Sequence, residues 1–272
     1  MLYAMVLKLD SRVPVVWRTP TSVQLGVDPP RVVFDDVTTV QERMLAALES
    51  GVSRPGLDLI ARESGSDERD VDRLLAAVAP AMEPDGPRAG RRPVSVVGTG
   101  PTAERIAEAL ADVGLRVRAT RAAEDGEFDL AIAVGHFVLD PDYYGFWLRR
   151  DQPHLPVIFG DSATTIGPLV EPGFGPCLYC LERYRSEADP AWPAIAAQLW
   201  GRRSAAETPL SSAEVAAAVA RMAVRRLSLG VPGDGSSIRL SPDTGAIERR
   251  TWKPHPACGC ISMLMDERAQ SA

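Results

Sequence analysis

The feature that most constrains this 272-residue chain is the placement of its cysteines, because it has only four and they form two close pairs. The pairs are Cys177-Leu-Tyr-Cys180 and Cys258-Gly-Cys260. A tetrahedral zinc ion takes four sulfur ligands at about 2.3 Å, and two short loops brought together by the fold can supply them. Residues 181–257 separate the pairs, so a shared ion would join a late loop to the C-terminal segment. We therefore expect one structural zinc site with the ligands Cys177, Cys180, Cys258 and Cys260.

Other uses of the four thiols stay open at the level of the sequence. Two disulfides would need an oxidising compartment, and the N-terminus lacks the basic region, apolar core and cleavage site of a secretory signal. A redox dithiol and unrelated free thiols are further alternatives. His255 is a candidate to replace one sulfur, because Cys258 and Cys260 stand closer together than the usual two-residue spacer allows. The missing signal and the reduced thiols indicate a cytoplasmic protein.

Composition excludes several classes of protein. A hydrophobic content of 45% is enough to build sizeable cores, so we expect a globular chain. The formal net charge of −6 argues against nonspecific nucleic-acid binding, which depends on clustered positive charge. No apolar run reaches the roughly 18 residues that a membrane-spanning helix needs. Neither nucleic acid nor membrane is therefore expected as a partner.

The chain divides at a charged stretch rich in Pro and Gly, which predicts a linker at residues 84–93. Residues 1–83 contain three short β-like runs followed by three helical patterns, which indicates a winged-helix-like α+β module. Residues 94–272 alternate between strand and helix patterns, as in an α/β domain with a mostly parallel sheet. The fold class expected for the whole chain is α/β.

The second domain opens with a glycine-rich turn, Gly98-Thr-Gly100-Pro-Thr-Ala103, between a strand and a helix. Backbone N–H groups at such a helix N-terminus can hold a phosphate, so Gly98, Gly100 and Ala103 are candidate cofactor-binding residues. Pro101 removes one of these donors. The second strand carries arginines, Arg118 among them, where a nucleotide-binding protein normally places the acid that binds ribose. A structural turn and an NADP-dependent oxidoreductase, with arginine on the 2′-phosphate, are the competing interpretations.

On these residues the chain resembles a known family. The segments 175–180 and 255–260, together with the turn at 98–100, are similar to ThiF-like, ubiquitin-activating-type proteins associated with the cyclodehydratases that make azole-containing peptides, the TOMM systems. Residues 14–17 and 23–29 resemble the PqqD-like element that recognises leader peptides. The resemblance covers nearly the whole chain. It implies a Rossmann-type, ThiF-like second domain with a zinc-stapled C-terminus.

The resemblance also implies a role in peptide presentation. The chain would be a non-catalytic scaffold that binds the leader of a ribosomal precursor peptide and presents it to a separate YcaO cyclodehydratase for thiazole- or oxazole-type modification. By family analogy, the leader adds as a strand along the third strand of the module and lies against its third helix. A homodimer is a further implication. The expected peptide-binding residues are Arg31, Val32, Val33, Phe34, Val71, Leu74, Leu75 and Val78.

The alternative function is an ATP-dependent, ThiF-type adenylyltransferase that activates a peptide or carrier-protein C-terminus. Such an enzyme needs a ribose-binding acid, which this chain lacks at the expected place. Asp161 and Asp129 are the remaining acids near strand ends, and a capping or structural role competes for both. The sequence therefore offers an incomplete ATP site and no assignable catalytic residue.

Overall fold

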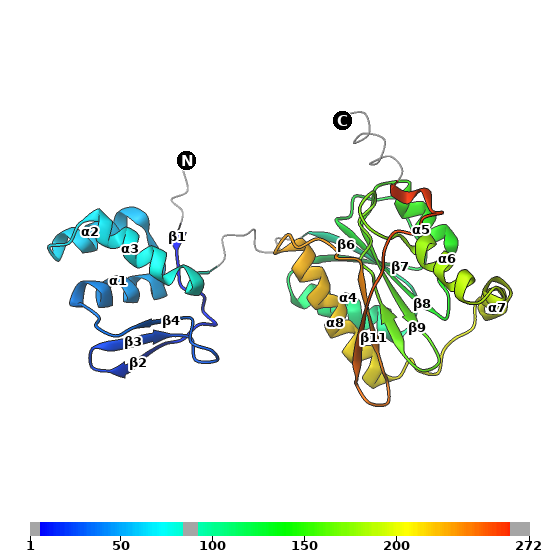
Figure 1. The fold of residues 1–272 in the computed structure, drawn as a ribbon, viewed down its shortest axis with the longest axis horizontal. Helices are drawn as coiled ribbons and strands as arrows, with labels where there is room; N and C mark the ends of the chain where they lie inside the picture. The colour runs from blue at the N-terminus through cyan, green and yellow to red at the C-terminus, as the bar shows by residue number, and fades with distance from the viewer. Residues whose placement is uncertain (1–5, 84–91, 262–272) are drawn as a thin grey trace. The chain divides into compact units, whose positions relative to one another are not determined.

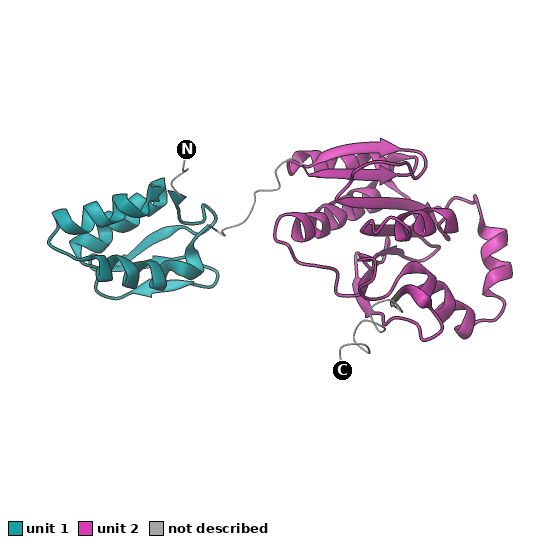
Figure 2. Ribbon diagram, turned by 90° about the horizontal axis from the view of Figure 1, so that it is seen from above, with its two compact units in different colours: residues 1–85 teal, residues 86–272 magenta. Residues whose placement is uncertain are grey.

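The structure is a computed structural model that describes residues 6–83 and 92–261. Contacts within the chain divide it into two compact units, residues 1–85 and 86–272 (Figure 2). Each unit has a hydrophobic core of its own. Most of the linker expected at 84–93 lies outside the described residues. Among the described residues, no helix combines the length and the apolar character needed to cross a membrane.

Unit 1 combines a three-stranded antiparallel sheet, in the order β2-β3-β4, with three helices and a short strand pair, β1-β5. Its elements are β1 (Val6–Leu7), β2 (Val15–Thr19), β3 (Ser22–Leu25), β4 (Val32–Phe34), α1 (Thr39–Ser50), β5 (Val52–Ser53), α2 (Arg54–Glu63), α3 (Glu68–Val78) and the 3₁₀ turn η1 (Ala79–Ala81). The expected succession of three strands and three helices is present, with β1 and β5 added.

Local sequence signals set the helix starts in unit 1. Thr38 caps α1 in a capping box with Gln41, and Asp67 caps α3 in the same way with Asp70. Pro55 lies in the first turn of α2, where its missing N–H costs no hydrogen bond. The apolar faces of all three helices then pack on β3 to form the core of the unit.

Unit 2 is built on a seven-stranded mixed sheet in the order β12-β11-β10-β9-β8-β6-β7. Its strands are β6 (Pro93–Val97), β7 (Arg116–Thr120), β8 (Leu130–His136), β9 (His154–Phe159), β10 (Thr164–Ile166), β11 (Ser236–Leu240) and β12 (Ile247–Thr251). Its helices are α4 (Pro101–Asp112), α5 (Pro141–Leu148), α6 (Leu178–Ala188), α7 (Trp192–Leu199), α8 (Pro209–Leu227) and the 3₁₀ turn η2 (Gly259–Ile261).

The expectation of a mostly parallel sheet needs correction. Strands β7, β6, β8 and β9 pair in parallel, whereas β10, β11 and β12 join the sheet antiparallel. For the β9–β10 and β11–β12 pairings, the physical reason is the length of the connection. Short loops join β9 to β10 and β11 to β12, and a short loop can only return the chain antiparallel.

Helices cover both faces of this sheet (Figure 1). On one face, α4 and α8 lie side by side and pack on strand residues that include Val96 and Ile132. On the other face, α5 and α6 pack on Ala131 and Ala133 of β8. Because β6 and β8 run parallel, their carboxyl ends lie at the same edge of the sheet, beside the N-terminus of α4. Both candidate sites of this unit depend on this packing.

Candidate metal centre and glycine-rich turn

The four cysteines expected to bind a metal come together in unit 2. Cys177 is the N-cap residue of α6 and Cys180 lies in its first turn, while Cys258 and Cys260 follow β12. The Sγ atom of Cys177 lies 3.7 Å from those of Cys180 and Cys258, and the Sγ atoms of Cys180 and Cys260 are 3.4 Å apart. In a tetrahedron with metal–sulfur bonds of about 2.3 Å, sulfurs stand about 3.8 Å apart. The donor set therefore fits one ion of the size of zinc.

The environment of the thiols also suits a cation. None of the four is in a disulfide, and Cys177 and Cys180 are buried. A hydrogen bond from the Cys177 thiol lowers the pKa of Cys180 to about 4, while the same contact, together with burial, raises the pKa of Cys177. Several thiolates packed this closely repel one another, so all four can ionise together only with a compensating positive charge. Among the described residues, no other three His, Cys, Asp or Glu side chains converge in this way.

His255 does not take a place in the cluster. Its Nδ1 accepts a hydrogen bond from the backbone N–H of Ala257 at 3.1 Å, which leaves the proton on Nε2. Nε2 lies 2.8 Å from a carboxylate oxygen of Glu187 and donates to it. The ring is buried edge-on against Tyr184, with their centroids 4.7 Å apart. With both nitrogens engaged, His255 orients the loop that carries Cys258 and has no free lone pair for a metal.

The glycine-rich turn connects β6 to α4 as expected. Gly98 and Gly100 have φ angles of 146° and 103°, which favour glycine, and a Cβ on Gly98 would lie 3.0 Å from the carbonyl oxygen of Val134. Beside the turn, on the β7 side, lies an open cavity of about 650 Å³. Its lining includes Gly98, Gly100, Ala103, Arg118 and Arg121, so the three candidate cofactor-binding residues lie together at one cavity.

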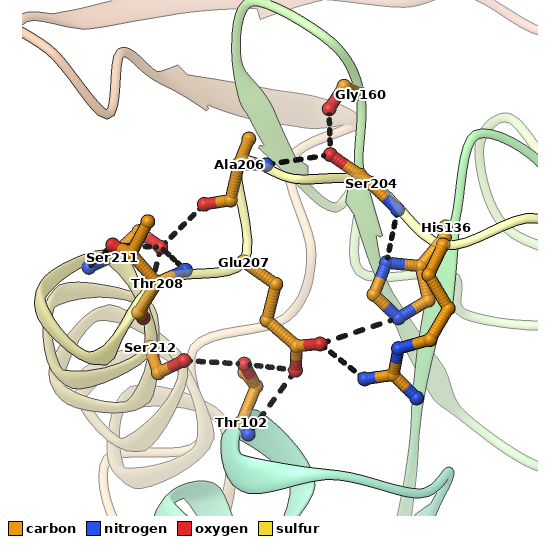
Figure 3. Close-up of polar contacts among 10 residues, drawn as sticks. Thr102, His136, Gly160, Ser204, Ala206, Glu207, Thr208, Ser211 and Ser212 are labelled. Atoms are coloured by element: carbon orange, nitrogen blue, oxygen red, sulfur yellow. Dashed lines mark hydrogen bonds and ion pairs between the residues drawn. The ribbon is translucent and has the colours of Figure 1, made fainter.

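On the β8 side of the same turn lies a buried polar network that sequence reasoning missed (Figure 3). The Glu207 side chain is only 4% exposed and points at the first turn of α4. One of its carboxylate oxygens accepts hydrogen bonds from the Thr102 hydroxyl at 2.7 Å and from the Thr102 backbone N–H at 3.3 Å. The other pairs with Arg203 and lies 3.5 Å from Nε2 of His136. No local pattern predicts these contacts, because Glu207 follows Thr102 by 105 positions.

The electrostatics of this network keep Glu207 ionised. Burial raises the pKa of Glu207, but hydrogen bonds from Thr102 and Arg203 outweigh burial and hold the pKa below its ordinary value. Burial also lowers the pKa of His136, so its ring is neutral near pH 7. Nδ1 of His136 accepts from the backbone N–H of Ser204 at 3.3 Å, which leaves its Nε2 proton facing Glu207. At neutral pH, the formal charges of the network are thus one carboxylate and one guanidinium.

The residues expected to bind a peptide fall into two groups in unit 1. In β4, Val33 is 37% exposed and its two neighbours are half-buried. Among the described strands, β4 pairs only with β3, so its other edge is unpaired. The guanidinium of Arg31, just before β4, donates to the carbonyl oxygen of Pro80 at 3.2 Å and thereby links this strand to the end of α3. On α3, Val71, Leu74 and Val78 are buried in the core and Leu75 is half-buried.

The two acids considered for an ATP site, Asp161 and Asp129, make local contacts. The Asp161 carboxylate, in the exposed loop after β9, accepts a hydrogen bond from the backbone N–H of Ser162 at 2.8 Å. Asp129 precedes β8, and a carboxylate oxygen lies 3.9 Å from the guanidinium of Arg92. Asp161 thus caps its loop, and Asp129 forms a surface ion pair.

No family model and no curated protein matches the chain in sequence. Solved structures do match it in fold. The heterocyclase TruD superposes with a TM-score of 0.70 and 18% identity, covering 97% of this chain and 44% of that one. E. coli MccB, solved with MccA, gives a TM-score of 0.61 and 12% identity over 94% of this chain and 100% of its own. A chain of the E. coli microcin synthetase McbBCD complex gives 0.50 and 15%, with 94% and 100% covered.

This chain spans less than half the length of the heterocyclase chain. At identities of 12–18%, the matches concern the backbone arrangement. They extend over nearly all of this chain, both units included. The chain therefore shares its fold with the heterocyclase, MccB and microcin synthetase chains.

Proposed function

We propose that this chain is a non-catalytic scaffold that binds the leader of a ribosomal precursor peptide and presents it to a YcaO cyclodehydratase. The observation that carries the proposal is the unpaired edge of β4, in a chain whose fold is shared with a heterocyclase. Another structure of a heterocyclase contains substrate and cofactor, and MccB has been solved with MccA. Ribosomal peptides that receive thiazole- or oxazole-type rings are the substrate class that fits this setting.

Strand addition is the mode of binding that the geometry favours. An extended leader alongside β4 would form backbone hydrogen bonds with Val32, Val33 and Phe34, and these bonds supply affinity without requiring a particular sequence. The exposed Val33 would then contribute to sequence preference through its side chain. Because Val71, Leu74 and Val78 of α3 are buried in the core of the unit, they would support the fold around β4 and would not touch the peptide. Of the expected residues on that helix, Leu75 is the one with partial exposure.

The metal site has a structural role in this proposal. Four thiolates fill the coordination sphere of zinc and leave no position for a reacting water. Zinc held by Cys177, Cys180, Cys258 and Cys260 would fix the C-terminal segment to α6. The ion would thus stabilise unit 2 and take no part in chemistry.

Presentation works through effective concentration. A leader bound to the scaffold keeps the core peptide near the active site of a cyclodehydratase supplied in trans, so modification accelerates without any catalytic residue in this chain. The proposal includes a homodimer. It also includes residence in the cytoplasm, because the thiols that hold zinc must stay reduced.

The second candidate is an ATP-dependent adenylyltransferase that activates a peptide or carrier-protein C-terminus. Its support is that MccB, which has this fold, has also been solved with ATP. The cavity of about 650 Å³ beside Gly98 and Gly100 is large enough for part of a nucleotide. Against it stands the β8 side of the turn, where Glu207 places a negative charge close to where the phosphates would lie.

Two measurements on the purified full chain separate the candidates. Fluorescence anisotropy with labelled leader peptides encoded beside its gene should give saturable binding. Pyrophosphate–ATP exchange with the same peptides should stay at background. Exchange above background would favour the adenylyltransferase, and an absence of binding to every such leader would contradict the scaffold.

A further inference from the structure

The glycine-rich turn has two different sides. It follows β6, which lies between β7 and β8 in the sheet. In open α/β sheets, ligands bind in the crevice beyond the carboxyl ends of such strands. Here the β7 side of that crevice is the open cavity, whereas the β8 side is filled by Glu207, Arg203 and His136 (Figure 3).

Glu207 stands where a helix N-terminus attracts an anion. The first backbone N–H groups of a helix have no partner within the helix, and the helix dipole adds positive potential there. Thr102, in the first turn of α4, donates both its backbone N–H and its hydroxyl to the Glu207 carboxylate. A bound phosphate would use the same donors, so the carboxylate and a phosphate compete for one place.

Arg203 covers the turn from outside. A Cβ on Gly100 would lie 2.7 Å from Nη2 of Arg203, so the guanidinium lies directly against the glycine. The same guanidinium pairs with the Glu207 carboxylate. One short segment thus supplies both an anion for the α4 N-terminus and a cation that neutralises it.

The remaining groups around Glu207 are engaged as well. The Thr102 hydroxyl lies 2.8 Å from the Ser212 hydroxyl at the start of α8, and the backbone N–H of Ser204 holds His136 in place. The groups that face Glu207 are therefore Thr102 from α4, His136 from β8 and Arg203 from its own loop. Each of these side chains thus has a hydrogen-bond or ion-pair partner within the protein, so the network is complete without a ligand.

We infer that Glu207 is a built-in anion that occupies the phosphate position of the glycine-rich turn, so that an anionic ligand enters only by displacing Glu207 and Arg203. The carboxylate thus opposes the binding of a nucleotide phosphate on the β8 side of the turn, where the helix N-terminus would otherwise attract it. The inference concerns a different site from β4 and holds whether or not that strand binds a leader.

Inorganic pyrophosphate is a direct probe of this inference. We would titrate it at neutral pH into the isotope-labelled full chain and follow the amide resonances of Gly100 and Thr102. In the wild-type protein, millimolar pyrophosphate should leave both resonances unmoved. In Glu207→Ala, both should respond at a concentration at least tenfold lower, because the competing carboxylate is gone.

The matched control is Glu104→Ala. Glu104 is an exposed acid in the same first turn of α4 and lines the open cavity, so it tests for a general effect of removing nearby negative charge. It should behave as the wild type. If Glu207→Ala does not fold, Glu207→Gln keeps the shape of the side chain without its charge and should still respond more strongly than the wild type.

Either of two results would overturn the inference. One is a wild-type response at the concentration that moves Glu207→Ala, and the other is a folded Glu207 variant that responds no better than the wild type. Leader affinity, measured on the same samples, should be equal in all variants. If the wild-type protein bound no leader peptide, that result would count against the scaffold proposal and would leave the inference about Glu207 unaffected.

Discussion

The Sγ atoms of Cys177 and Cys258 lie 3.7 Å apart although 81 positions separate the two residues in the sequence. One belongs to the start of α6 and the other to the segment that follows β12. A contact of this kind joins the last strand of the sheet to a helix on its face. Its loss should therefore be felt well beyond the four thiols.

Replacing Cys180 with serine should remove the metal and destabilise unit 2. The variant keeps three sulfurs but loses the buried one that lies nearest Cys260, so zinc content should fall from one ion per chain to near zero. The free energy of unfolding of unit 2 should decrease by about 3 kcal/mol or more, because structural metal binding is coupled to folding. Elemental analysis and thermal unfolding check both. Full zinc content with an unchanged melting temperature would refute the metal assignment.

Replacing His255 with alanine tests whether this residue orients the loop of Cys258 or binds the metal itself. The variant loses the buried ring that packs against Tyr184 and the hydrogen bond from Ala257, so the free energy of unfolding should fall by about 2 kcal/mol, while the solvent-screened contact with Glu187, whose side chain is 62% exposed, adds little. Zinc content should stay at one ion per chain. A loss of zinc as complete as in Cys180→Ser would instead make His255 a ligand.

Replacing Val33 with aspartate should weaken leader binding about tenfold, since the exposed side chain would lose its apolar contact while the strand keeps its backbone groups. Val6→Asp is the control, because Val6 is 63% exposed and lies in β1, outside β4 and outside residues 14–17 and 23–29. It should bind the leader as the wild type does. Anisotropy titrations give both Kd values, and equal values for the two variants would argue against binding at β4.

The buried ring of His154 should make unit 2 sensitive to acid. Burial lowers the pKa of His154 to about 4 from an ordinary 6.5. Its Nε2 has no hydrogen-bond partner among the described residues. The unfolded chain binds this proton more readily, so the stability is complete above about pH 6.5 and is lost as the pH falls towards 4. The total loss is about 3 kcal/mol.

The His154→Phe variant tests this pH dependence. Urea midpoints measured between pH 7 and pH 4 should fall less steeply in the variant than in the wild type, because phenylalanine has no proton to bind. The absolute stability of the variant does not matter for the comparison. Parallel curves would show that another group controls the acid response.

A methyl group on Gly98 should disrupt the start of α4. Alanine there would meet the Val134 carbonyl oxygen at 3.0 Å and would have to adopt a φ of 146°, so the cost should be about 2–3 kcal/mol. Gly65→Ala has a positive φ but open space around the new methyl group, and should cost less. Equal decreases in the free energy of unfolding would show that the contact with the Val134 carbonyl oxygen does not contribute to the cost at Gly98.

Much of this architecture was predictable because its signals are local. The cysteine spacing predicted which four thiols meet, and the glycine-rich segment predicted a turn between strand and helix. Capping residues such as Thr38 and Asp67 stand within a few positions of the contacts they make. In each case, the residues that interact are neighbours in the sequence or of a rare type.

The features that escaped prediction depend on distant parts of the chain. Glu207 is one of 36 acidic residues, and nothing near it in sequence marks it as the partner of Thr102. Nε2 of His255 is engaged by the carboxylate of Glu187, which lies 68 positions earlier, and this contact keeps the ring from binding the metal. The burial of Val71, Leu74 and Val78 by the rest of unit 1 was likewise hidden, because an amphipathic pattern shows which face of a helix is apolar without showing what covers that face.

Strand β12 is exposed along its whole length and forms one edge of the seven-stranded sheet, and the two C-terminal cysteines follow it closely. An ion at these cysteines would therefore clamp the outermost strand in place. Without it, β12 can peel away and bare the largely buried β11, whose backbone would then offer a free edge to another chain. We expect removal of the metal by a chelator to cause aggregation before the protein unfolds, because the ion keeps the edge of the sheet covered by β12.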